Sequence, residues 1–265
     1  EVKDALVEYT RSGGMTRGIC LMNADLQQVD LVNHEYKQGF DFSYADFYRA
    51  NLSGAHLFNI KLARASLMKA DLRYAKLNCA NLKLANLLGV KWQGCKIEHI
   101  RLSEIVKQEL DAKRELKKGN TEKANDFFEQ AEEIYRGLRK HSEQEGIFTL
   151  SGELIQRELT ARRKQMPKYS FKRFSSKLVD LFCGYGEDPV RIVGLSMCII
   201  AICATLYTFT GLSYNGEAFV YSSSKSIGEN ISVFFSCLYY SVVTFTTLGY
   251  GDFTPVGISR AIAAV

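Results

Sequence analysis

A strict five-residue period runs through most of the first hundred residues and constrains the fold more than any other feature of this sequence. A large apolar residue recurs at every fifth position, and a small or apolar residue stands two positions before each of these centres. The thirteen centres of the unbroken run are Phe42, Phe47, Leu52, Leu57, Leu62, Leu67, Leu72, Leu77, Leu82, Leu87, Trp92, Ile97 and Leu102. A period of five fits neither an α-helix, at about 3.6, nor a strand, at about two.

Four further repeats precede this run in a frame that shifts by one residue at Gly39. Their centres are Leu21, Leu26, Leu31 and Tyr36. A period of five fits a square coil, in which each five-residue side turns one corner and the large and small residues both point inward. Coils of this kind stack through backbone hydrogen bonds at a spacing of about 4.8 Å.

The Ala-Asp/Asn-Leu pattern, as in Ala70-Asp71-Leu72 and Ala80-Asn81-Leu82, resembles that of the pentapeptide-repeat family. The resemblance implies a right-handed quadrilateral β-helix over residues 19–104, with four repeats in each turn. Seventeen repeats would give about four coils and a rod of about 20 Å. We expect this domain to serve as a structural or assembly module, because a solenoid by itself is a scaffold.

Solenoids of this family are known as mimics of DNA, a role that requires an acidic surface. Residues 19–104 carry eight acidic and eleven basic side chains, which leaves a net charge of +3. DNA mimicry is therefore disfavoured. The formal net charge of +5 over the whole chain does not favour nucleic-acid binding either, so we expect no nucleic-acid partner.

Residues 105–167 change to a helical period and are expected to form an α-helical hairpin connector. Asn120 is predicted to cap the first helix, and the second is predicted around Leu150–Lys164 and ends before Pro167. Such a hairpin resembles a single tetratricopeptide-like unit, which cannot bury its own apolar face. We expect it to pack on the solenoid or on another subunit. The charged run Glu153–Lys164 is interpreted as a solvated face, with a regulatory surface as the alternative.

Residues 168–187 alternate basic and apolar side chains near helical spacing. The basic set would face phosphate head groups, so this segment is predicted to be an amphipathic helix on the membrane surface. It is comparable to the slide helix of two-transmembrane channels. The alternative is an ordinary basic helix on a soluble core. The Gly184-Tyr185-Gly186 sequence at its end is interpreted as a turn.

Residues 188–265 are predicted to be a transmembrane domain. The 21 residues Ile192–Leu212 carry no charge and are long enough to cross a bilayer. The basic residues that precede them place the N-terminal domains in the cytoplasm by the positive-inside rule. Ser213–Asn230 is then expected to be an external loop.

The segment after this loop resembles the pore helix and signature sequence of potassium channels. The signature residues are Thr247, Leu248, Gly249, Tyr250, Gly251 and Asp252. In such a filter, K⁺ is held by backbone carbonyls in place of its hydration shell. The expected ion-binding carbonyls are those of Thr247, Leu248, Gly249 and Tyr250, with the Thr247 hydroxyl in addition.

Glycine permits the alternating backbone handedness that points successive carbonyls in one direction, which explains Gly249 and Gly251. The resemblance implies that the Tyr250 side chain points away from the pore and packs on pore-helix aromatics, and that Asp252 hydrogen-bonds to such an aromatic. The expected supporting residues are Thr246, Asp252, Tyr239, Tyr240 and Val243.

The chain departs from the family pattern at two positions. Leu248 stands where valine is usual, but the backbone coordinates the ion, so selectivity should survive. Val243 stands where some members of the family carry a carboxylate that pairs with the aspartate. Support for the filter is therefore expected from Tyr240, Asp252 and apolar packing.

One filter strand cannot enclose a pore, so four chains are expected to form a homotetramer with fourfold symmetry. A second span should begin near Pro255–Arg260. Because Gly257–Val265 is too short to cross a bilayer, we expect the inner helix to continue beyond the sequence given.

The order of these domains resembles bacterial pentapeptide-repeat proteins fused to a two-transmembrane potassium-channel pore module. The predicted function is passive K⁺ conduction in the bacterial inner membrane, with K⁺ as the transported ion and no organic cofactor. The cytoplasmic portion would assemble the pore or regulate it. Regulation would involve an unidentified cytoplasmic regulator. A non-conducting membrane scaffold and a weakly selective cation channel are the alternatives. No nucleophile–base pair, metal cluster or phosphate loop is visible, so we do not expect an enzyme.

Overall fold

The computed structural model describes residues 2–35 and 38–264. The chain divides into two compact units, and the boundary between them lies between Glu187 and Asp188. The first unit contains the solenoid and the helices α1 to α5, and the second contains the helices α6 to α8 and a small sheet. Each unit is described by itself.

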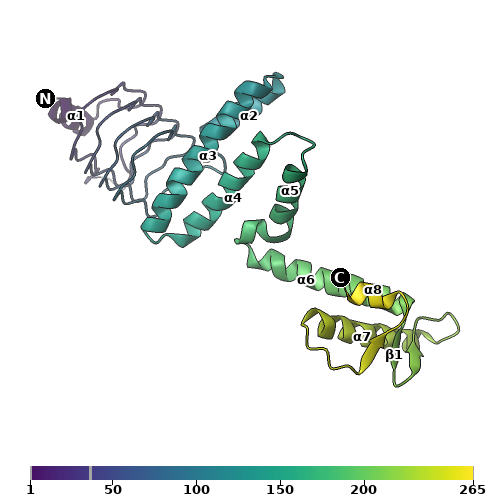
Figure 1. Cartoon of the computed structure of the whole chain (residues 1–265). Coiled ribbons are helices and arrows are strands. Elements are labelled where there is room, and N and C mark those ends of the chain that lie inside the picture. Colours follow the sequence, from purple (N-terminus) through teal and green to yellow (C-terminus); the bar gives the residue numbers. More distant parts are fainter. Residues whose placement is uncertain (1, 36–37, 265) are drawn as a thin grey trace. The chain divides into compact units, whose positions relative to one another are not determined.

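The solenoid is a stack of four-sided coils, as the five-residue period predicts (Figure 1). Parallel bridges join residues that are twenty positions apart, from Asp41 and Lys61 to Asn81 and Arg101, so four repeats make one turn. Phe47 N donates to Ser66 O of the next coil at 2.7 Å. The corners are turns in which the residue two positions after the centre has a positive φ, such as Arg49 at 55°.

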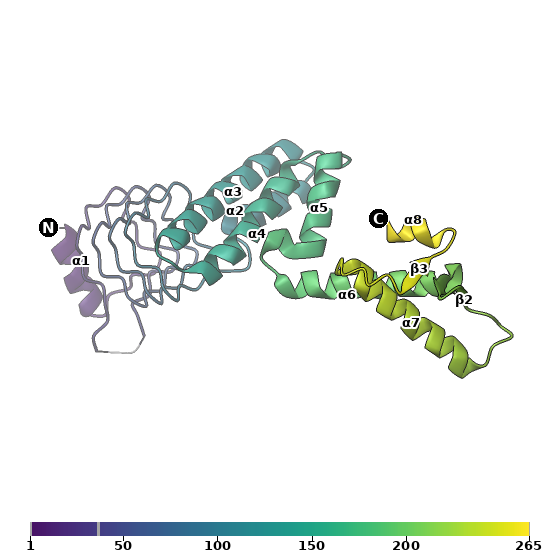
Figure 2. The ribbon, with the colours of Figure 1, turned by 60° about the horizontal axis from the view of Figure 1, so that its bottom comes forward.

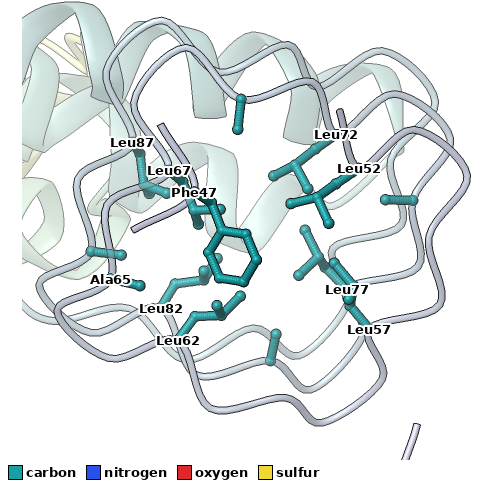
Figure 3. Packing of buried hydrophobic residues seen from close by; sticks show 14 of the residues in the cluster. Phe47, Leu52, Leu57, Leu62, Ala65, Leu67, Leu72, Leu77, Leu82 and Leu87 are labelled. Atoms are coloured by element: carbon teal, nitrogen blue, oxygen red, sulfur yellow. The ribbon is translucent and has the colours of Figure 1, made fainter. Parts of the chain in front are cut away.

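The repeat centres and the residues two positions before them fill the interior of the coils. Figure 3 shows the side chains of Phe47, Leu52, Leu62, Ala65 and Leu67 gathered inside the stack, and each of them is at most 1% exposed. Complete burial of a leucine or phenylalanine side chain stabilises a fold by about 1.5–3 kcal/mol. The five-residue period therefore corresponds to one continuous hydrophobic core.

The first coil is six residues longer than the others. Its bridges join residues that are 26 positions apart, namely Cys20 with Asp46, Asp25 with Asn51 and Asp30 with His56. The chain rejoins the stack at Gly39, the position of the frame shift. The repeat centred on Tyr36 lies outside the described residues.

Gly39 rejoins the stack where there is no room for a side chain. A Cβ atom at this position would lie 2.0 Å from the carbonyl oxygen of Asn59 in the next coil. Glycine is therefore required here by the close approach of two backbones.

A helix that was not predicted covers the N-terminal end of the solenoid. Helix α1, Val2–Arg11, places Leu6 in the same hydrophobic cluster as the repeat centres, with 5% of Leu6 exposed. Thr16 follows the helix, and its hydroxyl donates to the carbonyl oxygen of Asp41 at 2.7 Å. The helix covers the end of the stack opposite α2–α4 (Figures 1 and 2).

The connector consists of three helices, whereas a hairpin of two was predicted. They are α2 (Lys107–Lys117), α3 (Thr121–Gln144) and α4 (Phe148–Gln165). Helix α3 begins directly after Asn120, but the Asn120 side chain forms no cap and donates instead to Glu115 Oε2 at 2.8 Å. Helix α4 ends two residues before Pro167, as proline requires.

The connector packs on the last coils of the solenoid, as one of the two expected arrangements requires. The His141 Nε2 atom of α3 lies 2.7 Å from the carbonyl oxygen of Cys95, and its ring stacks on Trp92 at 6.2 Å. Lys96 pairs with Glu145 at 2.6 Å. Ile134, Leu138 and Leu154 belong to the same buried cluster as the repeat centres. The solenoid and α2–α4 therefore share one core.

The interpretation of Glu153–Lys164 as a solvated face is wrong for several of its residues. The Glu158 side chain is 6% exposed and accepts from Arg136 at 3.2 Å and from Arg139 at 2.7 Å. Lys164 reaches Glu109 of α2 at 2.5 Å. Most charged side chains of this run therefore face other helices. A carboxylate that is buried in this way is stable only with a cationic partner, and Glu158 has two.

Helix α5 (Phe171–Cys183) contains no buried residue. Its apolar residues Phe171, Phe174 and Leu181 are 81%, 59% and 66% exposed. The helix is attached to α4 through Arg163, whose guanidinium lies 2.7 Å from the Asp180 carboxylate and donates to the Tyr185 hydroxyl at 3.0 Å.

The Gly-Tyr-Gly sequence that follows α5 forms a short 3-10 turn, η1 (Gly184–Gly186), as expected. All three residues have positive φ angles, of 53°, 58° and 92°. The Tyr185 hydroxyl also lies 2.8 Å from the Ser176 hydroxyl. This turn closes back on α5 through its tyrosine.

The second unit begins with helix α6, Pro189–Thr210. Pro189 stands at the start of the helix, the Asp188 side chain accepts from Arg191 N at 3.3 Å, and Gly211 ends the helix with a φ of 89°. With a mean hydropathy of 2.2, α6 is the one helix among the described residues that is long and apolar enough to span a membrane. The predicted span extended to Leu212, but that residue begins strand β1.

The segment predicted as an external loop contains regular structure. Strands β1 (Leu212–Tyr214) and β2 (Glu217–Phe219) form a hairpin, and β3 (Phe253–Pro255) pairs with the other edge of β1, so the order is β2-β1-β3. Helix α7, Ile227–Phe245, starts within this segment and packs along α6 (Figure 2). A short helix, α8 (Ser259–Ala263), follows β3.

Candidate functional site

Helix α7 leads directly into the candidate filter, and a capping box fixes the start of the helix. The Ser226 hydroxyl accepts from the Glu229 amide at 3.3 Å, and the Glu229 carboxylate accepts from the Ser226 amide at 2.8 Å. This reciprocal pair satisfies two amides that a helix end leaves unpaired. The helix is 19 residues long, and the Ser-x-x-Glu spacing at its start is a capping-box pattern that was not recognised in the sequence.

A buried hydrogen bond and an aromatic pair are among the contacts that hold helix α7 against α6. The Ser241 hydroxyl donates to the Ile200 carbonyl oxygen at 3.0 Å. The rings of Tyr240 and Tyr207 meet edge to face at 5.1 Å. These contacts fix the orientation of the helix that ends at the filter.

The predicted supporting residues face different sides of this helix. Tyr240 is 9% exposed, and within one chain its ring packs on Tyr207 of α6. Val243 is 5% exposed. The Thr246 hydroxyl donates to the Val242 carbonyl oxygen at 2.8 Å and closes the end of the helix. Only Tyr239 of the two tyrosines lies next to the residues that follow the filter.

The filter segment leaves the helix through backbone hydrogen bonds. Leu248 N donates to Val243 O at 3.1 Å, and Thr247 N donates to Thr244 O at 3.0 Å. Beyond this point the filter has few contacts within one chain, since Leu248 and Tyr250 are 60% and 67% exposed. The structure thus holds the first two filter residues on the last turn of α7.

Backbone handedness alternates along the filter. Thr247, Gly249 and Gly251 have φ angles of 57°, 56° and 77°, and the residues between them do not have positive φ. A Cβ atom on either glycine would meet no atom within 4 Å. Glycine is therefore needed here for its conformation and not for space, as the sequence predicted, and Thr247 shares the same conformation at a greater cost.

Beyond the filter, Asp252 is held by two neighbours. Its carboxylate accepts from the Phe253 amide at 3.0 Å and is hydrogen-bonded to the Tyr239 hydroxyl. The Phe253 ring lies against the rings of Tyr214, at 4.9 Å, and Tyr239, at 6.0 Å. The aromatic partner that the resemblance implied for Asp252 is therefore Tyr239.

The sheet at this end of the site was not predicted, although the sequence contains a signal for half of it. Asn215 and Gly216 connect β1 and β2 with φ angles of 51° and 89°. An Asn-Gly pair between two short strands is typical of a tight hairpin turn. The pairing of β1 with β3 has no local signal, because the two strands are about forty residues apart in the sequence.

Two families of known proteins match different parts of this chain. A family model described as an ion channel matches residues 197–265, and a model of pentapeptide repeats, in eight copies, matches residues 50–89 and 65–103. A curated relative, protein LctB of Geobacillus stearothermophilus, is 45% identical over 53 residues. The match covers 20% of this chain, and the chain spans about 40% of the length of that relative.

Solved structures of pentapeptide-repeat proteins are similar to part of the chain. One from the thylakoid lumen of Arabidopsis thaliana is 28% identical, with 33% of this chain and 53% of that chain covered and a TM-score of 0.18. One from Nostoc is 29% identical, with 38% and 94% covered and a TM-score of 0.19. The two family matches show that the chain joins pentapeptide repeats to a two-transmembrane ion-channel domain and is a membrane protein.

Proposed function

We propose that four copies of this chain form a potassium-selective pore that conducts K⁺ passively. The observation that carries the proposal is the alternating backbone at Thr247, Gly249 and Gly251, placed directly after a helix that packs on the candidate span. A filter of this kind replaces the hydration shell of K⁺ by a ladder of backbone carbonyls. The carbonyls of Leu248 and Tyr250 complete that ladder.

The exposure of the filter supports assembly into a tetramer. Tyr250 is 67% exposed within one chain, and Tyr240, the expected brace, faces α6. In a fourfold assembly, a neighbouring chain supplies the cover that Tyr250 lacks. Apolar groups that stay this exposed in a monomer are typical of contact surfaces.

The N-terminal domains lie in the cytoplasm in this proposal, and α5 lies on the membrane surface. The apolar residues Phe171, Phe174 and Leu181 are all more than half exposed, and Lys168, Lys172 and Lys177 accompany them. An exposed apolar face with a basic flank matches the chemistry of the interface between acyl chains and anionic head groups.

The solenoid then serves assembly or regulation of the pore. Its core is continuous with that of α2–α4, so these elements move as one body. Arg163 joins this body to α5 through Asp180 and Tyr185. A cytoplasmic partner that binds the solenoid would act on the pore through this joint.

Ion flux into proteoliposomes that contain the full chain tests the proposal. We expect K⁺ uptake that greatly exceeds Na⁺ uptake, and no uptake with Gly249→Asp, because a carboxylate and a Cβ disrupt the filter backbone. Equal K⁺ and Na⁺ uptake would favour a weakly selective cation channel. If wild type and Gly249→Asp both fail to conduct, a non-conducting scaffold is the better description.

Orientation is tested with an impermeant thiol reagent. Cys20 lies on the exposed surface of the first coil. We expect Cys20 to react in inside-out vesicles and not in intact cells, with Cys20→Ala as the control for the other cysteines. Labelling of Cys20 in intact cells would contradict a cytoplasmic solenoid.

A further inference from the structure

Within one chain, the candidate filter is held at its two ends and not along its length. Leu248 N donates to Val243 O at 3.1 Å, which attaches the first end to α7. Between the ends, Leu248 and Tyr250 are largely exposed, and a Cβ at Gly249 would meet no atom within 4 Å. The geometry of the filter therefore depends on what holds its second end, at Asp252.

The second end is attached through Phe253, whose ring contacts three segments of the chain. The ring centroids of Phe253 and Tyr214 are 4.9 Å apart. Phe219 and Tyr239 meet the same ring edge to face at 5.6 Å and 6.0 Å. Edge-to-face aromatic pairs at these distances add to stability beyond the contribution of the apolar area that they bury. Phe253 is thus the common member of an aromatic cluster drawn from β1, β2 and α7.

The backbone of Phe253 is fixed by the sheet. β3 is antiparallel to β1, with Tyr214 opposite Phe253 and Leu212 opposite Pro255. Leu212 is 1% exposed and lies in the core between α6 and α7. A second attachment lies a few residues further along the chain, where the Ser259 hydroxyl donates to the Gly211 carbonyl oxygen at 2.6 Å. The residues after the filter are therefore attached twice to the end of α6.

Asp252 depends on Phe253 for its orientation. The Phe253 amide donates to the Asp252 carboxylate at 3.0 Å, and the same carboxylate is hydrogen-bonded to Tyr239, which also touches the Phe253 ring. Val243 offers no carboxylate behind the filter that could share this role. Displacement of the Phe253 ring would therefore remove the ring contact that positions Tyr239, and Asp252 would keep only the backbone amide of residue 253 as a fixed partner.

We propose that Phe253 is the positioning residue of the filter's second end, which it holds in the ion-binding conformation through Asp252 and the β2-β1-β3 sheet. The inference rests on the proposed function of the filter. Phe253 does not contact the ion. It stabilises the ordered filter relative to a collapsed one, and its loss shifts that balance by at least about tenfold, since three ring contacts are lost at once.

Two measurements on the full-length protein test this role. The first is the melting temperature in detergent, in KCl and in NaCl at equal ionic strength, because an ion that binds only the ordered filter raises the melting temperature. The second is the time course of K⁺ current in planar bilayers at low and high external K⁺. The variants are Phe253→Ala, Phe253→Tyr and, as a matched control, Phe209→Ala, which breaks an aromatic pair with Tyr221 elsewhere in the same unit.

We expect Phe253→Ala to lose most of the K⁺-dependent rise in melting temperature, and its current to decay at least about tenfold faster than that of wild type. High external K⁺ should slow this decay, because an occupied filter resists collapse. Phe253→Tyr keeps the ring and should restore both properties. Phe209→Ala should match wild type in both.

The opposite results separate the possible failures. If Phe253→Ala melts lower in both salts by the same amount and its current is steady, Phe253 only stabilises the fold and the inference is wrong. If wild type is stabilised by K⁺ but conducts nothing, the proposed function fails and the melting data still decide the inference. A wild type that conducts K⁺ but melts at the same temperature in KCl and NaCl would overturn the inference and leave the proposed function standing. If Phe253→Ala does not assemble, Phe253→Leu, which keeps apolar volume without the ring, takes its place with the same expectations.

Discussion

Replacement of Gly39 by alanine is expected to weaken the solenoid at one identifiable place. The new Cβ would lie 2.0 Å from the Asn59 carbonyl oxygen and 3.0 Å from Ile60 N. Both atoms belong to the backbone of the next coil, so no side-chain rotation relieves the contact. The two coils must separate locally by about 1 Å to restore van der Waals distance.

The cost of that separation follows from the bonds on either side of the contact. Lys61 N donates to Phe40 O at 2.9 Å, and Phe42 N donates to Lys61 O at 2.8 Å. Each of these bonds contributes about 1 kcal/mol net, and each buried group left without a partner costs about 1–3 kcal/mol. We therefore expect Gly39→Ala to lower the local opening free energy by about 2–4 kcal/mol.

Hydrogen exchange of the full-length protein, followed by mass spectrometry of peptides that contain Lys61, measures this opening. A loss of about 2 kcal/mol corresponds to exchange about thirtyfold faster. Gly18→Ala is the matched control, because Gly18 has a φ of 74° but its Cβ would meet no atom within 4 Å. The control should cost about 1 kcal/mol, through conformation alone.

Equal exchange rates in Gly39→Ala and Gly18→Ala would refute the reasoning. That result would mean that the coils yield to a new methyl group without losing their hydrogen bonds. The close approach at Gly39 would then not be the reason for glycine at this position.

Three other changes have defined outcomes. Arg163→Gln removes the 2.7 Å pair with Asp180 and should make the α5 amides exchange at least about tenfold faster, since a charge-assisted bond contributes about 1.5–3 kcal/mol. Burial raises the pKa of Glu109, but the hydrogen bond and charge of Lys164 outweigh it and hold that pKa below 4.5. Its contribution to stability is thus complete above pH 4.5 and lost as pH falls through the lowered pKa, so Glu109→Gln should flatten the acid dependence of α2–α4 exchange. Ser226→Ala should cost about 1 kcal/mol in the first turn of α7.

Each of these three changes has a control and a contrary outcome. Arg162→Gln, half exposed in the wild type, should leave α5 exchange unchanged, and equal effects of the two arginine variants would disprove the role of Arg163 as the joint. An acid profile unaltered by Glu109→Gln would assign the acid sensitivity to other carboxylates. Ser232→Ala is an exposed change within α7 and should not weaken its first turn, so an equal effect there would contradict the capping box.

Local patterns in the sequence predicted the elements whose structure depends on local backbone chemistry. The repeat centres determined which side chains of the solenoid are buried, because each five-residue side of a coil points its centre inward, and from Asp41 onward four sides make a coil of twenty residues. Gly249 and Gly251 indicated the alternating filter backbone, which only glycine adopts at low cost. The uncharged run predicted helix α6, although Gly211 ends the helix before the predicted limit at Leu212.

Contacts between distant segments produced the errors. The charge of Glu158 gave no sign of Arg136 and Arg139, since the partners lie on another helix. Nothing in the sequence indicated that Tyr240 packs on Tyr207 of α6, because the direction of a helical side chain depends on the helix that packs against it. Helix α1 has only ten residues, too few to be predicted from the sequence. Its apolar residue Leu6 is buried only because the helix covers the exposed end of the first coil.

The sequence by itself determined the coil with its buried centres, the apolar helix α6 and the filter backbone, since each follows from the period or the conformational range of neighbouring residues. Only the tertiary structure decided that α1 and α2–α4 cover the two ends of the solenoid and that Arg163 joins α4 to α5. It also decided that β3 pairs with β1, which places Phe253 beside Tyr239 and Tyr214. These features depend on contacts between segments that are far apart in the sequence. A local sequence pattern does not specify which distant segments pair, or in which register.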